Sequence, residues 1–90
     1  MNLSDFKELI KKNSDKGRKT EFFKVNLSID DYRKSKPTDY GIEETFVADY
    51  DKNNRDYIIY YPDRESEHRL KNNDVEEEFY EKGWGGYMHK

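Results

Sequence analysis

The densest apolar stretch of the chain is ETFVADY (residues 44–50), followed by the polar segment DKNNRD (51–56) and then YIIYY (57–61). β-Branched and aromatic residues favour strands, and a short polar segment between two such runs is typical of a turn. The stretch therefore predicts a β-hairpin on which the core forms. Neither run has a wholly polar face, because apolar side chains occupy both sides of each strand.

Further helix and strand patterns lie on both sides of this hairpin. Near the N-terminus, Leu3, Phe6, Leu9 and Ile10 recur at spacings of three and four, which predicts an amphipathic helix of about ten residues. Residues 20–29 alternate between apolar and polar and predict a half-buried strand. Residues 74–82 predict a second helix, which Gly83 ends.

Together these patterns predict one small α+β domain over residues 1–90. It has a three-stranded antiparallel sheet, formed by residues 20–29, 44–50 and 57–61, packed with an N-terminal and a C-terminal helix. We expect the helices on one side of the sheet, Tyr and Thr side chains on the other, and Trp84 closing the core. The expected strand residues of the core are Phe23, Val25, Leu27, Val47 and Ile59.

The composition indicates a folded chain despite its polarity. Only 32% of the residues are hydrophobic and 41% are charged, but eight Tyr, five Phe and one Trp supply a large apolar area. The absence of Cys excludes a disulfide scaffold and a thiolate metal site. The first residues lack a signal-peptide pattern, and no apolar run approaches the roughly 20 residues of a membrane span, so we expect a cytoplasmic protein.

The net charge of −3 hides an asymmetry along the chain. Residues 1–42 carry ten Lys and Arg against seven Asp and Glu, whereas residues 43–90 carry seven against 13. Such a charge dipole favours steering towards a charged partner. A basic cluster near the N-terminus is a candidate phosphate-binding patch or else a solvated loop. It consists of Lys11, Lys12, Lys16, Arg18 and Lys19.

The sequence lacks the spacings that known catalytic and metal sites require. Neither His68 nor His89 has a second ligand at a metal-binding spacing. The acids that begin at Asp49 do not form a calcium loop, because Asn54 and Tyr60 stand where Gly and Glu are needed. We therefore predict no catalytic residues, no metal and no cofactor, and we expect that the protein is not an enzyme.

Three pieces of the chain resemble a class of phage proteins. They are the helix start NLSDF (2–6), the hairpin segments VADYD (47–51) and IIY (58–60), and the acidic run EEEFY (76–80). With these pieces the chain resembles the small acidic proteins that phages encode against host defence and repair enzymes, such as Cas9-directed anti-CRISPR proteins and the uracil-DNA glycosylase inhibitor. The resemblance implies an inhibitor that acts in the host cytoplasm, and the basic cluster makes it a mixed-charge one.

We therefore expect a non-enzymatic protein–protein interaction module that binds a basic nucleic-acid-binding groove of an enzyme such as Cas9. Carboxylates on a helix and a hairpin can imitate phosphates, and tyrosines can serve as anchors. One alternative is a nucleic-acid-binding or regulatory accessory protein that uses the basic cluster, and another is a toxin-neutralising immunity protein. The expected partner-binding residues are Asp49, Tyr50, Asp51, Asp56, Tyr57, Tyr60, Glu76, Glu77 and Glu78.

Overall fold

The helix and strand patterns build an α+β fold in the computed structural model, which describes residues 1–26 and 41–89. The predicted hairpin is present, and its strands are longer than expected. In chain order the elements are α1 (Leu3–Asp15), β1 (Thr20–Asn26), β2 (Gly41–Asp51), β3 (Asp56–Tyr61), η2 (Pro62–Arg64), β4 (Ser66–Leu70), α3 (Asn72–Glu81), η3 (Trp84–Gly86) and β5 (Met88–His89).

The sheet has five strands in the order β4-β3-β2-β1-β5, and every neighbouring pair is antiparallel. The prediction of three strands was therefore too low. β4 was missed because its sequence, SEHRL, is almost entirely polar, as is common at the edge of a sheet. β5 was missed because two residues carry no periodicity. The predicted core residue Leu27 lies outside the described residues.

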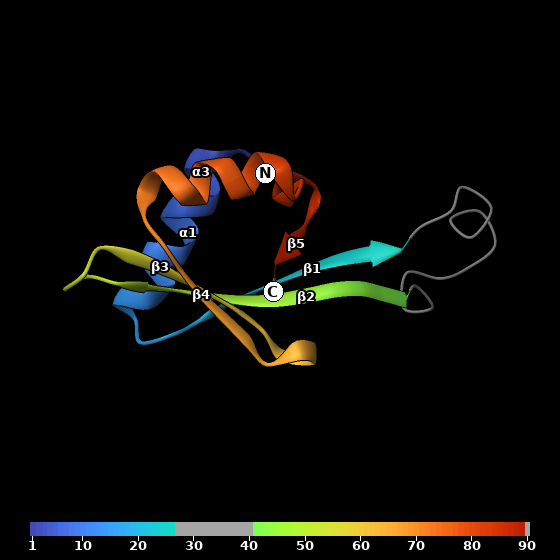
Figure 1. Cartoon of the computed structure of the whole chain (residues 1–90), viewed down its shortest axis with the longest axis horizontal. Coiled ribbons are helices and arrows are strands. Elements are labelled where there is room, and N and C mark those ends of the chain that lie inside the picture. The colour runs from blue at the N-terminus through green and yellow to red at the C-terminus, as the bar shows by residue number, and fades with distance from the viewer. Residues whose placement is uncertain (27–40, 90) are drawn as a thin grey trace.

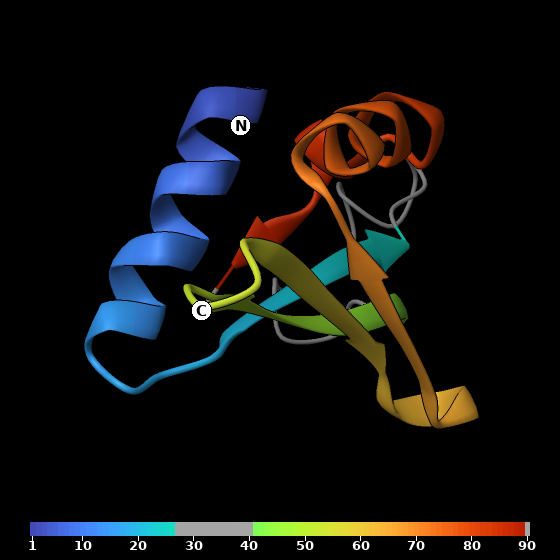
Figure 2. The same ribbon diagram turned by 60° about the vertical axis from the view of Figure 1, so that its left-hand side comes forward.

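Both helices pack on the same face of the sheet, as Figures 1 and 2 show. The Asn2 side chain caps α1 by accepting a hydrogen bond of 2.8 Å from the backbone N–H of Asp5. α3 begins two residues before the predicted helix, and Gly83 follows it with a left-handed φ of +66°. Each helix is too short to be stable in isolation, so its apolar side must dock on the sheet.

Aromatic rings fill the space between the helices and the sheet. Trp84 is 0% exposed, and its ring centroid lies 5.4 Å from that of Phe6 on α1 and 4.8 Å from that of Phe46 on β2. Phe6 also lies 4.8 Å from Phe22 on β1. Such ring pairs stabilise the fold beyond the effect of the area that they bury. Since Phe6 lies near the N-terminus and Trp84 near the C-terminus, this cluster holds both ends of the chain on the sheet. Trp84 closes the core, as the sequence predicted.

The two faces of β1 and β2 are the reverse of those that the sequence predicted. Phe22 is fully buried against the helices, whereas Phe23, Val25 and Val47 are half-buried. β1 pairs with β2 so that Phe22 lies opposite Phe46, and a shift of one residue moves every side chain of a strand to the other face. The prediction of Phe23, Val25 and Val47 as core residues was therefore wrong, while Ile59 is buried as predicted.

Candidate interaction surface

The sheet face opposite the helices, here called the open face, carries apolar side chains. In the described part of the chain both helices pack on the other side of the sheet, so neither covers this face. Cross-strand pairing places Tyr60 beside Val47, and Met88 beside Phe23. Tyr60 is 37% exposed and Met88 is 51% exposed. Exposed large apolar side chains gathered on one sheet face are a common mark of an interaction surface.

A hollow of about 420 Å³ lies on the open face. Apolar side chains of β2 and β3 contribute to it, together with two carboxylates and one ammonium group. This combination of an apolar surface with a few charged groups is the usual composition of a binding hollow. Its lining residues are Lys19, Val47, Asp49, Ile58, Tyr60 and Glu67.

The two carboxylates give this hollow a net negative charge. One oxygen of Asp49 accepts a hydrogen bond of 2.8 Å from the backbone N–H of Tyr50, which fixes the orientation of the carboxylate. Glu67 on β4 lies directly across from Tyr60 on β3. Among the described residues, no ion pair involves Asp49, Glu67 or Lys19. A cationic side chain of a partner would therefore find carboxylates that are not already neutralised.

The structure brings only two of the predicted partner-binding residues, Asp49 and Tyr60, into this hollow. Tyr50 and Tyr57 lie on the helix side of the sheet, with ring centroids 4.9 Å apart. Tyr57 is 1% exposed, and its hydroxyl has no hydrogen-bond partner among the described residues. The ammonium group of Lys11 lies 5.0 Å from the Tyr50 ring. Tyr57 is thus a core residue, which removes it from the surface anchors expected from the sequence.

Asp51 and Asp56 lie at the end of the β2–β3 hairpin, where both are engaged within the chain. Asp51 accepts hydrogen bonds from the backbone N–H groups of Asn53 at 3.0 Å and Asn54 at 3.2 Å. These hydrogen bonds, with those of Asn54 foremost, hold the pKa of Asp51 below its ordinary value. Asp56 is almost buried and pairs with Lys71. Both carboxylates therefore organise the turn.

The acidic residues of α3 lie on the helix side of the molecule, away from the open face. Glu76 links the two helices through an ion pair of 2.8 Å with Lys7. Glu77 is exposed to solvent. Glu78 borders a second, smaller hollow beneath α3. The predicted acids are thus divided between the two sides of the sheet, so they do not form one surface.

The basic cluster predicted from the sequence lies at one end of the molecule. Lys11 and Lys12 belong to α1, which extends further than predicted, and Lys16, Arg18 and Lys19 follow it on the connection to β1. Lys19 also lines the open-face hollow. Four of these side chains, those other than Lys11, lack a described partner and are exposed.

The open face includes residues that the sequence did not single out as functional. Phe23, Val47 and Ile58 were assigned to the core or left without a role, and Glu67 lies in a strand that was not predicted. The presence of apolar residues on both faces of the hairpin was the one available signal. This pattern predicted that both faces of the hairpin carry apolar side chains. The helices cover one of these faces and leave the other open.

Within the described ranges there is no group of three or more His, Cys, Asp or Glu residues able to hold a metal ion. No helix in these ranges is long and apolar enough to cross a membrane. The chain matched no protein-family model, no curated protein and no solved structure.

Proposed function

We propose that this chain is a non-enzymatic interaction module whose open face binds a basic protein. The observation that carries the proposal is the hollow in which Asp49 and Glu67 flank Tyr60. The aliphatic stem of an Arg or Lys could pack on Val47 and Ile58, and its charged head could contact the carboxylates and the Tyr60 ring. Such a contact combines an aromatic anchor with complementary charge.

The partner we propose is a nucleic-acid-processing enzyme, with the chain acting as an inhibitor of the anti-CRISPR kind. Grooves that bind nucleic acid are lined with Lys and Arg side chains that neutralise phosphates. These cations are complementary to the carboxylates and the aromatic ring of the open-face hollow. Only part of the predicted acidic surface supports this proposal, because Asp51 and Asp56 are engaged within the chain. Blocking of the groove would therefore depend on the open face. There the shape of the hollow and the contact of the Tyr60 ring would add to the attraction of the carboxylates.

Affinity capture with matched charge reversals tests the proposal. The variant Asp49→Lys with Glu67→Lys changes the charge of the open face. The control Glu77→Lys with Glu81→Lys makes the same change in net charge at exposed positions on α3. A basic protein captured from a bacterial lysate by the native chain and by the control, but not by the open-face variant, would support the proposal. Loss of capture by the control alone would place the contact on α3 and overturn it.

Kinetics with the captured protein distinguish steering from anchoring. The open-face reversal should slow association and flatten its dependence on salt, because charges at the rim of an interface act mainly on the encounter. Tyr60→Ala should instead speed dissociation by about tenfold or more, the usual effect of losing an aromatic anchor. Unchanged rates in both variants would exclude the open face as the contact.

The exposed basic residues beyond α1 favour one second candidate, direct binding of nucleic acid. Binding of the isolated chain to duplex DNA at low salt, weakened by Lys16→Glu with Arg18→Glu, would promote this candidate over inhibition.

A further inference from the structure

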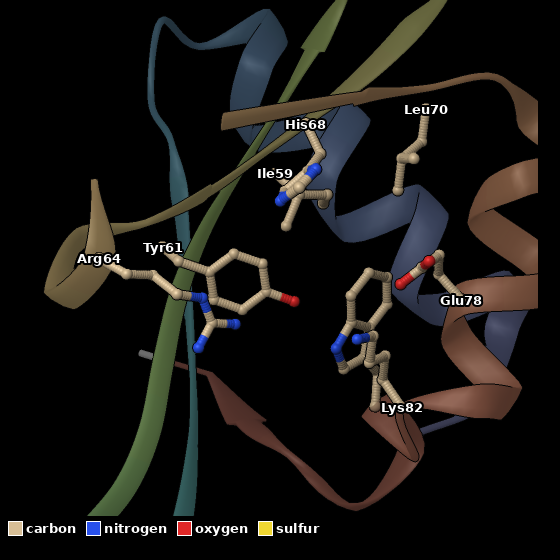
Figure 3. A pocket seen from close by; sticks show the side chains of 8 residues that line it. Ile59, Tyr61, Arg64, His68, Leu70, Glu78 and Lys82 are labelled. Carbon is tan, nitrogen blue, oxygen red and sulfur yellow. The ribbon is translucent and has the colours of Figure 1, made fainter. Parts of the chain in front are cut away.

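A second hollow lies on the helix side of the sheet, between β3, β4 and α3 (Figure 3). Its volume is about 100 Å³, which is somewhat smaller than the roughly 150 Å³ cavity that holds benzene in another protein. Scaled from the six carbon atoms of benzene, such a volume suits a ligand of about four or five non-hydrogen atoms. Its lining residues are Ile59, Tyr61, Arg64, His68, Leu70, Glu78, Lys82 and Trp84.

The indole N–H of Trp84 is a buried donor with no hydrogen-bond partner among the described residues. An unsatisfied buried donor destabilises the fold, so a donor of this kind in a residue that lines a hollow indicates a place for an acceptor. The indole lies close to the Tyr61 hydroxyl, where its N–H opposes the rise in the pKa of Tyr61 that burial causes. An oxygen atom of a ligand in the hollow could accept from both groups.

The Tyr61 hydroxyl is a second donor. Burial of the ring and the negative charge of Glu44 raise the pKa of Tyr61 above its ordinary value of 10.0, so the hydroxyl keeps its proton at neutral pH. Figure 3 shows this hydroxyl pointing into the hollow, with Arg64 on one side and Glu78 and Lys82 on the other. The guanidinium carbon of Arg64 lies 4.0 Å from the centre of the Tyr61 ring.

Charged groups complete the hollow. Arg64 is held by Glu44 through an ion pair of 3.1 Å, which leaves Lys82 as the lining cation without an ion-pair partner among the described residues. Glu78 is the lining acid. Among the side chains that line the hollow, hydrogen-bond donors therefore outnumber acceptors. Ile59 and Leu70 supply an apolar wall. Oxygen acceptors and a short apolar tail are the chemistry that this arrangement complements.

We propose that this hollow binds a small carboxylate, with its oxygens accepting from the indole N–H of Trp84, the hydroxyl of Tyr61 and the ammonium group of Lys82. The apolar tail lies against Ile59 and Leu70. The carboxylate can belong to a free short-chain acid or to the C-terminus of a peptide. This site lies on the opposite side of the sheet from the open face, so it does not depend on the proposed function.

The single Trp makes the test direct, since the chain has one indole N–H signal in a proton–nitrogen NMR spectrum. Titration with sodium propionate should shift that signal saturably, and titration with propionamide or ethylammonium chloride should not. N-acetylglycylglycine serves as the peptide probe. A shift with propionate identifies a free acid as sufficient, and a shift with N-acetylglycylglycine alone identifies a chain end. No saturable shift with either carboxylate, or an equal shift with propionamide, would overturn the proposal.

Surface variants test the charges without disturbing the core. Lys82→Gln should weaken carboxylate binding about tenfold, because it removes a charge-assisted hydrogen bond. Glu78→Gln should strengthen binding a few-fold, because it removes a like charge. Glu77→Gln, an exposed neighbour that does not line the hollow, is the matched control and should leave binding unchanged. Equal affinity in all three variants would contradict the proposed position of the carboxylate.

Discussion

Gly85 is required by the close approach of two segments that are distant in sequence. A Cβ atom built on Gly85 would lie 2.9 Å from the backbone oxygen of Met1 and 3.4 Å from the Phe79 ring. Gly85→Ala should therefore cost about 1–3 kcal/mol of unfolding free energy, measured by urea denaturation. Gly86→Ala is the matched control, because no atom lies within 4 Å of its Cβ, and it should be neutral or slightly stabilising. Equal effects of the two changes would contradict this packing.

Glu44 should contribute to stability in a pH-dependent way. A hydrogen bond of 2.5 Å from the Tyr87 hydroxyl, more than the nearby Arg64, holds the pKa of Glu44 below its ordinary value of 4.5. A lowered pKa means that the stabilisation is fully present above pH 4.5 and is lost as the pH falls through the folded-state value.

Glu44→Gln tests this contribution. At pH 7 the variant should be less stable by about 1 kcal/mol, the usual scale for a charged hydrogen bond that is partly exposed. As the pH falls below 4.5, the difference between the native chain and the variant should shrink. Unfolding by urea at several pH values measures it, with Glu77→Gln as the control. A difference that grows towards acid pH would contradict the assignment.

At the scale of elements, the helices cover one face of β1 and leave the other open. Substitutions on β1 should therefore differ in their effect on the free energy of unfolding. Phe22→Ala should cost about 3–5 kcal/mol, because this ring packs 4.8 Å from Phe6 and 5.1 Å from Phe46 in the core. Val25→Ala, at a half-buried position, should cost less than about 1.5 kcal/mol. Thermal melts of both variants measure the difference. A larger loss for Val25→Ala than for Phe22→Ala would contradict the burial of Phe22 in the core.

The sequence predicted elements better than it predicted their faces. The hairpin and both helices follow from local periodicity, which depends on side chains within a few residues of each other. In β1, however, Phe22 and Phe23 are adjacent aromatic residues, so the local pattern fits either face. Pairing with β2 decides between them, and that contact is not encoded locally. β4 escaped prediction because an edge strand needs little apolar character.

The candidate surface was predicted only in part, because some of its residues come together only through strand pairing. Asp49 and Tyr60 could be named from the hairpin alone, since residue type and strand position sufficed. Their neighbour Glu67 comes from β4, so its place beside Tyr60 requires the β3–β4 pairing. Asp56 was predicted as a contact residue because charge is visible in a sequence, whereas its ion pair with Lys71 is visible only in the fold.

At the scale of the whole molecule, one measurement reports on closure of the core. Trp84 is 0% exposed and is the only Trp of the chain. Its fluorescence should be blue-shifted in the native protein and should move to longer wavelength on unfolding in urea, because unfolding returns the indole to water. A native emission maximum equal to that of free indole would show that the segment containing Trp84 is not docked.

The late position of Trp84 in the chain has a consequence during synthesis. Phe6 and Phe46 are added to the chain before Trp84, whose ring contacts both of them. At about 5–20 residues per second, roughly 2 to 8 seconds separate the addition of Phe46 from that of Trp84. In that interval the aromatic residues of the core lack one of the rings that they pack against in the folded chain. We therefore expect the incomplete chain to bind chaperones that hold exposed aromatic segments until the segment containing Trp84 has been added.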